Sequence, residues 1–411
     1  MTQGPTSRAG LETVRSILGP IVHLDHSADE TPAAHRRLGA EVGDQARAFV
    51  LSRILTRPAD HFQSELLRAR QCAGECQRRL AAGRVPGPVR HALEVYLTSL
   101  QAWAEGACLG DLALQSMGDL RIEGGRVTAT DLAFLLQAET VGCQTGMLRD
   151  RDGGVHLWHT EEDRDWTSGP RFDRLRLFTC KASPEAQSRT MTGFIYPDLL
   201  PGPAFGWSGP GYAQAVDAFY LQPGIGAPGV PANAVTWVCL FLGGVIPAAQ
   251  VAQSLAPIQS GYALSSLTRR ADGILAGVTE FVGEFIHTSD LEQAPGAWTF
   301  TVNLLSPRAA KAAPGREDLE PEMRGALDAR MRRVHRAMSL VTQGAGDWGE
   351  ALRRLLAFRV GGDFATSNPS VKATFLGCIS SGSTSYRVDP GPALRPLADA
   401  ASVDGGYRLD E

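Results

Sequence analysis

Residues 138–163, AETVGCQTGMLRDRDGGVHLWHTEED, decide the fold expected of this 411-residue chain. Gly142 and Cys143 open a segment with strand character. The acidic, glycine-bearing stretch 149–154 has the composition of a hairpin turn, and residues 155–160 return as a second strand that ends in acidic residues. The stretch therefore predicts a β-hairpin with a cysteine at the start of its first strand.

The chain before this hairpin has helical periodicity. Apolar residues recur mostly at three- and four-residue intervals in 34–55, with charged residues on the opposite side. Prolines and glycine separate this stretch from further helical patterns. We expect helices at 34–55, 60–82, 88–109 and 131–139.

The chain after the hairpin alternates between strand and helix character. Short segments rich in β-branched and aromatic residues are divided by turn clusters, and the sequence GWSGPG at 206–211 is typical of a turn. We expect one long strand, with a bulge, at 274–288. The other expected strands are 172–180, 191–197, 262–269 and 298–305, and residues 371–388 return to strand character. The expected helices are 234–258, interrupted by Gly243-Gly244 and Pro247, and 319–341.

This order of elements favours an α+β fold with mixed, mainly antiparallel sheets over a doubly wound parallel fold. The sequence has no Gly-x-Gly-x-x-Gly motif after a strand and no Gly-x-x-x-x-Gly-Lys motif. Both absences argue against nucleotide chemistry.

Composition excludes several classes of protein. The net charge of −4 lacks the positive field of a nucleic-acid binder, and the apolar run 234–249 is too short for a bilayer span of about 20 residues. No nucleic-acid or membrane partner is therefore expected. Seven cysteines, an odd number and mostly scattered, suit reduced thiols better than a disulfide framework. The chain is expected to be cytoplasmic.

The segment around Cys143 resembles the Ntn-hydrolase superfamily, and specifically the acyl-coenzyme A:6-aminopenicillanic acid acyltransferase family. The resemblance rests on the Gly142-Cys143 pair, Thr145 two positions on, the Asp152-Gly153 turn and the acidic end at 161–163. Further similarity extends over about residues 30–390, in the motifs RRLGAEVG at 36–43, DLAFLL at 131–136 and FTVNLL at 300–305.

The resemblance implies a four-layer αββα sandwich and autocatalytic cleavage of the Gly142–Cys143 bond. Residues 1–142 would form a helical N-terminal portion packed on the core, and residues 143–411 the catalytic portion. The cleaved chains could self-associate. Cys143 would then supply both a thiol nucleophile and an α-amino base, whose reference pKa is about 7.7–8.0.

The same resemblance implies roles for other residues. Asn303 would be an oxyanion-hole donor. Asp163 would orient the nucleophile's amine or assist the initial N-to-S acyl shift, so both residues are catalytic candidates. Thr145, Glu161 and Trp207 are candidate substrate-binding residues. Two positions depart from the family pattern: Glu161 stands where the family has asparagine, and Leu304 where it has histidine.

The implied activity is that of a cysteine amidohydrolase or acyltransferase. Its substrates would be a small-molecule amide or thioester acyl donor, acyl-coenzyme A included, and water or an amine as acceptor. No cofactor is expected. A metal site is not expected either, because Cys72 and Cys76 lack a second ligand pair nearby in sequence.

Two alternatives stay open at this point. One is a non-catalytic descendant of the fold that binds a small acyl ligand or a partner. The other is an uncleaved hydrolase in which His159 or His287 serves as base for Cys143. His156 and His159 lie three apart on one strand, so they should point to opposite faces of the sheet.

Overall fold

The structure is a computed structural model of the chain. It describes residues 22–117, 120–137, 142–162, 176–186, 189–219, 228–306, 321–342, 359–360, 363–364, 371–390 and 407–410.

The first part of the described chain is mainly helical. A short strand precedes a run of helices, whose bounds lie within a few residues of the expected ones, except that the third helix ends earlier and another helix follows it. The elements are β1 (Val22–Asp25), α2 (Thr31–Thr56), α3 (Ala59–Ala81), α4 (Gly87–Gly106), α5 (Leu109–Met117), β2 (Arg121–Ile122), β3 (Gly125–Arg126) and α6 (Ala129–Gln137).

A nine-stranded sheet follows the order β1-β6-β7-β8-β9-β11-β12-β13, with β10 paired to β11. Its pairs are antiparallel except β1–β6 and β10–β11. Its remaining strands are β6 (Arg176–Lys181), β7 (Thr190–Ile195), β8 (Phe205–Ser208), β9 (Tyr212–Ala218), β10 (Val230–Pro231), β11 (Ile258–Arg270), β12 (Gly273–Gly283) and β13 (Phe285–Asp290).

A six-stranded antiparallel sheet has the order β14-β4-β5-β17-β18-β19. The hairpin expected within 138–163 forms β4 and β5, which lie next to β14, one edge strand of this sheet. Its strands are β4 (Gly142–Arg149), β5 (Val155–Glu162), β14 (Trp298–Thr301), β17 (Val371–Ile379), β18 (Thr384–Pro390) and β19 (Tyr407–Asp410), and a separate ribbon pairs β15 (Arg359–Val360) with β16 (Asp363–Phe364).

The two sheets pack face to face over one hydrophobic cluster. Phe205 and Trp207 of β8 stack on Phe375 of β17, with ring centroids 4.9 and 5.8 Å away, and Trp207 also stacks on Tyr386 of β18. Because these rings come from both sheets, the inner faces form a single dry core.

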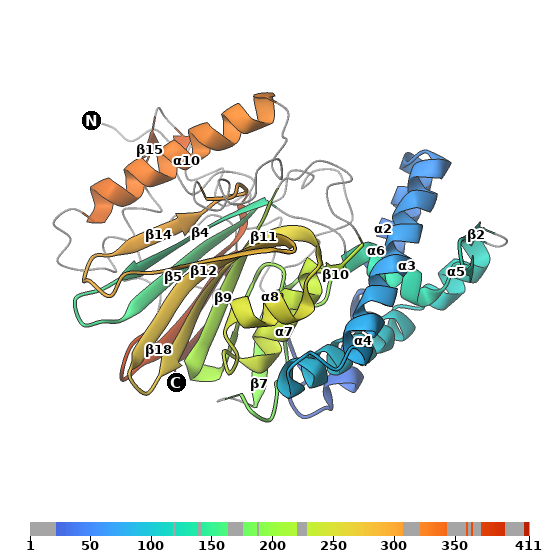
Figure 1. Cartoon of the computed structure of the whole chain (residues 1–411), viewed down its shortest axis with the longest axis horizontal. Coiled ribbons are helices and arrows are strands. Elements are labelled where there is room, and N and C mark those ends of the chain that lie inside the picture. The colour runs from blue at the N-terminus through green and yellow to red at the C-terminus, as the bar shows by residue number, and fades with distance from the viewer. Residues whose placement is uncertain are drawn as a thin grey trace.

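Helices lie outside both sheets (Figure 1). The helices α2 to α6, α7 (Ala232–Leu242) and α8 (Ala248–Leu255) share a second hydrophobic cluster with the outer face of the nine-stranded sheet. On the other side, α10 (Pro321–Thr342) brings His335 against Trp298 and Phe300 of β14. Thr299 and Thr301 alternate with these two rings, so α10 lies on the outer face of β14.

This architecture confirms the expected α+β class and corrects two local predictions. The bulged strand expected at 274–288 is a hairpin of two strands, β12 and β13, that turns at Gly283, where the backbone φ is +60°. The turn expected at 206–211 is half strand, because Phe205–Ser208 pairs with both β7 and β9. The interruption expected in the helical stretch 234–258 is confirmed, because α7 ends at Leu242 and α8 begins at Ala248, directly after Pro247.

Among the residues that the structure describes, no helix is both long and apolar enough to cross a lipid bilayer.

The helices α2 and α4 approach each other closely at two glycines. A Cβ atom on Gly39 of α2 would overlap the carbonyl oxygen of Trp103, and one on Gly106 of α4 would overlap that of Arg36. Backbone lies against backbone at both positions, so no side-chain movement can relieve the overlap.

Replacing Gly39 or Gly106 with alanine should lower the free energy of unfolding by about 1–3 kcal/mol, because either methyl group forces the two helices apart. The matched control is Gly74→Ala on α3, where a Cβ meets nothing within 4 Å. That control should raise stability by roughly 0.5–1 kcal/mol through helix propensity. Urea unfolding measures all three variants, and equal effects at the three sites would contradict the close packing.

His35 anchors α2 on the nine-stranded sheet. Its ring is fully buried, 5.0 Å from Phe178 and 5.9 Å from Trp237 between ring centroids, and its Nδ1 lies 2.7 Å from the carbonyl oxygen of Thr31. Burial lowers the pKa of His35 from 6.5 to about 4. The ring is therefore neutral in the folded protein at neutral pH.

Folding stability should fall as the pH drops from about 6.5 to about 4. In that window the unfolded chain protonates His35 while the folded protein does not, at a cost of about 1.4 kcal/mol per pH unit. A His35→Gln variant keeps a donor for the Thr31 carbonyl but cannot titrate, so its stability should depend less steeply on pH than that of the wild type. Urea unfolding at several pH values measures both slopes, and identical slopes would contradict the assignment.

Candidate functional site

The register of the β4–β5 hairpin brings four polar side chains together. Cys143 pairs with Glu161, and Thr145 pairs with His159. Side chains alternate between the two faces of a strand, so all four share the face that also carries Met147, which lies between the two sheets. Each of the four is fully buried.

The turn between these strands fixes that register. The carboxylate of Asp150 accepts hydrogen bonds from the backbone N–H groups of Asp152 and Gly154, at 3.0 and 2.7 Å. The N–H of Asp150 in turn donates to the carbonyl of Gly154 at 2.8 Å. The tight acidic turn predicted from composition is therefore held by its own side chain.

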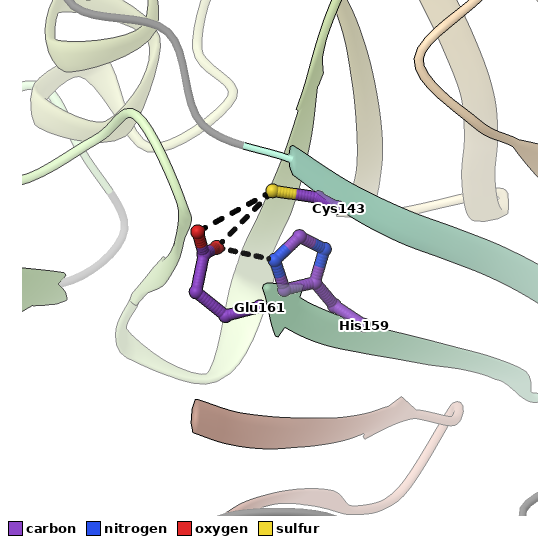
Figure 2. A group of neighbouring side chains, drawn as sticks. All are labelled: Cys143, His159 and Glu161. Atoms are coloured by element: carbon purple, nitrogen blue, oxygen red, sulfur yellow. Dashed lines mark hydrogen bonds and ion pairs between the residues drawn. The ribbon is translucent and has the colours of Figure 1, made fainter. Parts of the chain in front are cut away.

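The carboxylate of Glu161 lies between the thiol and the imidazole (Figure 2). The Sγ atom of Cys143 is 3.4 Å from Oε1 and 3.3 Å from Oε2 of Glu161. His159 Nε2 is 2.8 Å from Oε2, and Thr145 Oγ1 is 2.8 Å from His159 Nδ1. The four residues thus form one connected chain from hydroxyl to thiol.

The opposite sheet contributes a further contact that the sequence did not indicate. The hydroxyl of Tyr196, which directly follows β7, donates a hydrogen bond to Oε1 of Glu161. Burial raises the pKa of Tyr262 of β11, and the negative charges of Cys143 and Glu161 raise it further. Tyr262 therefore lies close enough to the site to interact with it electrostatically. Its hydroxyl donates to Asn233 of α7.

Burial governs the electrostatics of the site. Loss of solvent lowers the pKa of His159 to about 3, so its imidazole is neutral at physiological pH. A neutral imidazole carries one N–H, and the two contacts of its ring determine the tautomer. If Nδ1 donates to Thr145, Nε2 is an acceptor or a metal ligand; if Thr145 donates to Nδ1, Nε2–H donates to Glu161.

Asn303 follows β14 and is held at the same edge of β4. The β14–β4 register ends at Thr301 opposite Thr145, and Asn303 comes two residues later. Its Nδ2 donates to the carbonyl of Ala218 at 2.7 Å, and its Oδ1 accepts from Arg330 of α10 at 3.2 Å. An amide nitrogen has two N–H groups, so this arrangement leaves one of them for another acceptor.

The structure places the other predicted residues in different surroundings. Trp207 is part of the aromatic stack between the sheets. His287 lies on β13, the edge strand of the nine-stranded sheet, with Nε2 3.1 Å from the hydroxyl of Ser289. Asp163 lies outside the described residues. Of the two histidines weighed as base, the structure brings His159 together with Cys143 and Glu161 and places His287 on the edge strand β13 of the other sheet.

His156 points away from this site, as expected from its spacing to His159. On the outer face of the six-stranded sheet its Nε2 is 3.0 Å from Asp150 and 3.9 Å from Cys378 Sγ. The two histidines of β5 therefore serve opposite faces of one strand.

Glu161 was expected to bind substrate, and the structure places it in contact with the cysteine. Counting six residues outward along each strand from the Arg149–Val155 pair reaches Cys143 and Glu161. The position of the turn therefore predicts that Cys143 and Glu161 lie opposite each other. Tyr196 carries no comparable signal, because it comes from the other sheet.

No protein-family model matches the chain, and no curated protein matches it. Its site is therefore interpreted from its geometry. A thiol beside a buried carboxylate can lose its proton to that carboxylate. The set of Sγ, carboxylate oxygen and Nε2 can also ligate a metal ion, since all three atoms lie within 4.8 Å of one another.

Proposed function

We propose that the chain is an Ntn-type cysteine amidohydrolase or acyltransferase, built as a four-layer αββα sandwich with Cys143 as its nucleophile. The observation that carries this proposal is the position of Cys143: at the start of an inner strand, between two sheets, with a carboxylate 3.3 Å from its sulfur. Helices outside both sheets suit the four layers (Figure 1). None of the seven cysteines, all of which lie in the described residues, forms a disulfide bond, which suits action in the cytoplasm.

The first step of the proposal is cleavage of the Gly142–Cys143 bond. Glu161 accepts the proton of the Cys143 thiol, and the thiolate attacks the Gly142 carbonyl carbon. The C–N bond breaks as the nitrogen takes up a proton, which leaves a thioester between Gly142 and the sulfur. Water hydrolyses the thioester, giving a Gly142 carboxylate and a Cys143 with a free thiol and a free α-amine.

The second step is acyl chemistry on a small molecule. The α-amine of Cys143 now takes the thiol proton, and the thiolate attacks the carbonyl of an amide or thioester. The free N–H of Asn303 would donate to the oxyanion, which preorganised donors stabilise strongly. The leaving group departs with a proton, and water or an amine then releases the acyl group from the sulfur.

Because the thiol of Cys143 is buried, the proposal requires cleavage of the chain before an external substrate can reach it. The side chain of Cys143 is fully buried in the intact chain, where it is joined through Gly142 to α6. Breaking the Gly142–Cys143 bond would free Cys143 from the segment that joins it to α6. The proposed precursor is therefore inert toward external substrates, and the cleaved form is reactive.

One observation favours a second candidate function. His159 shares the Glu161 carboxylate with Cys143, so an uncleaved thiol hydrolase could use the carboxylate and imidazole together as its base. This candidate differs from the first in a simple property: its polypeptide stays intact.

Intact-mass analysis of the purified protein should show two polypeptides separated after Gly142. The Cys143→Ala variant should remain one chain, because it has no thiol to attack the carbonyl. Glu161→Gln should slow cleavage at least tenfold, since an amide cannot take the thiol proton. The control is Cys378→Ala, which removes a thiol from the outer face of the same sheet and should cleave normally.

A thiol-directed acylating probe should label Cys143 in the cleaved protein, and the uncleaved Glu161→Gln chain should resist it. An intact wild-type chain that is labelled at Cys143 would favour the uncleaved hydrolase. An intact chain that also resists the probe would refute both candidates.

Competition between acceptors should separate hydrolysis from transfer. If the acyl-enzyme reacts with amines, adding a primary amine to a turnover assay should divert product from free acid to amide without changing the rate of donor consumption. Quantifying both products by mass spectrometry measures the partition. A product ratio that does not change with amine concentration would identify a strict hydrolase.

A further inference from the structure

We propose that Cys143, His159 and Glu161 form a zinc site, and that bound Zn²⁺ reversibly inhibits the nucleophile. The inhibitory role rests on the proposed function, whereas the metal site itself does not. The proposal concerns the intact chain as well as the cleaved one.

The geometry of the three ligand atoms suits a tetrahedral ion. Zinc lies about 2.3 Å from sulfur and about 2.0–2.2 Å from nitrogen or oxygen, so at the tetrahedral angle a sulfur and an oxygen ligand are roughly 3.5–3.7 Å apart, and a nitrogen and an oxygen ligand roughly 3.3–3.6 Å. The two distances from Cys143 Sγ to the Glu161 oxygens, 3.3 and 3.4 Å, are slightly shorter than this sulfur–oxygen separation. His159 Nε2, 2.8 Å from Oε2, would need to move outward by roughly 0.5–0.8 Å, which a small rotation of either side chain supplies.

The surrounding hydrogen bonds orient these ligands. Thr145 Oγ1 contacts Nδ1 of His159, the ring nitrogen that faces away from Glu161. A histidine that binds metal through Nε2 donates Nδ1–H to such an oxygen, which fixes its tautomer. The hydroxyl of Tyr196 donates to Oε1 of Glu161, so Oε2 faces the imidazole (Figure 2).

The charges of the ligand set match a divalent cation. When bound, Cys143 is a thiolate, Glu161 a carboxylate and His159 neutral, which gives two negative charges against the two positive charges of Zn²⁺. A neutral ensemble is the arrangement that a dry core tolerates best. Burial already keeps His159 neutral, which is the form that binds metal.

Metal binding and nucleophilic attack exclude each other at Cys143. On binding, the thiol proton leaves for solvent, and the sulfur lone pair that would attack a carbonyl forms the bond to zinc. Three protein ligands leave the fourth tetrahedral position for water. Chelation restores the free thiol, so the inhibition is reversible.

Calorimetric titration of the chelator-treated, full-length protein with ZnCl₂ tests the site. We expect one Zn²⁺ per chain, with proton release and tighter binding at higher pH. Cys143→Ser and His159→Gln should each weaken the affinity at least tenfold, and Thr145→Val about 10- to 100-fold. Co²⁺ in place of Zn²⁺ should give a thiolate charge-transfer absorption band that Cys143→Ser lacks.

The matched control is His156→Gln on the opposite face of β5. His156 lies near Asp150 and Cys378 and is the competing location for a metal on the same strand. This variant should bind Zn²⁺ as the wild type does. If His156→Gln loses the metal while Cys143→Ser and His159→Gln keep it, or if the wild type binds none, the proposal is wrong.

Variants that fail to fold are recognised by thermal unfolding. Zn²⁺ should raise the melting temperature of the wild type and of His156→Gln. Folded Cys143→Ser or His159→Gln protein should show no such increase. A similar increase in all four proteins would place the metal elsewhere and overturn the proposal.

Acylating-probe labelling, with and without Zn²⁺, separates failure of the two proposals. Zinc binding in a protein that the probe never labels supports the metal site and refutes the acyl chemistry. Probe labelling of a protein that binds no zinc supports the acyl chemistry and refutes the metal site. Labelling that Zn²⁺ suppresses and a chelator restores supports both.

Discussion

The site depends on one constraint, the register of the β4–β5 hairpin, which sets Cys143 directly opposite Glu161. Both side chains lie on the inner face of the sheet, where burial removes them from bulk solvent and strengthens their interaction. A slip of one residue in either strand would move that strand's polar side chains to the outer face and bring apolar ones inward. The Asp150 turn and the dry core between the sheets both oppose such a slip, so chemistry and folding depend on the same pairing.

The core gives this pairing its electrostatic character. Glu161 is fully buried and contacts a hydroxyl, a thiol and an imidazole. Each of these groups can donate a hydrogen bond, and charge-assisted bonds of this kind are roughly twice as strong as neutral ones. These hydrogen bonds hold an oxygen of Glu161 beside the sulfur of Cys143 although no bulk solvent stabilises the carboxylate. Asparagine, which stands at this position in the family that the sequence resembles, could not accept the thiol proton.

The local features of this arrangement could be predicted from the sequence. The hairpin, the helices of the first third and the opposite faces of His156 and His159 follow from periodicity and turn chemistry, which act over a few residues. Tyr196 and the strands β8 and β9 were missed because sheet pairing supplies their context, and the Gly/Pro-rich composition of that region hides it. The resemblance to the family implies only a substrate-binding role for Glu161, whereas its contact with Cys143 depends on the register across the hairpin.

The two proposals for the site differ in where one proton goes. Acyl chemistry needs the thiol proton to move only as far as Glu161 or the α-amine, where it stays available for the leaving group. Zinc binding needs that proton to leave the protein, because a protonated carboxylate or thiol does not ligate the ion. The desolvation that holds His159 neutral also disfavours an isolated thiolate, so a charge on Cys143 must be matched locally. Under both proposals, the acidity of the buried thiol–carboxylate pair would therefore set the reactivity of Cys143 and the zinc concentration that inhibits it.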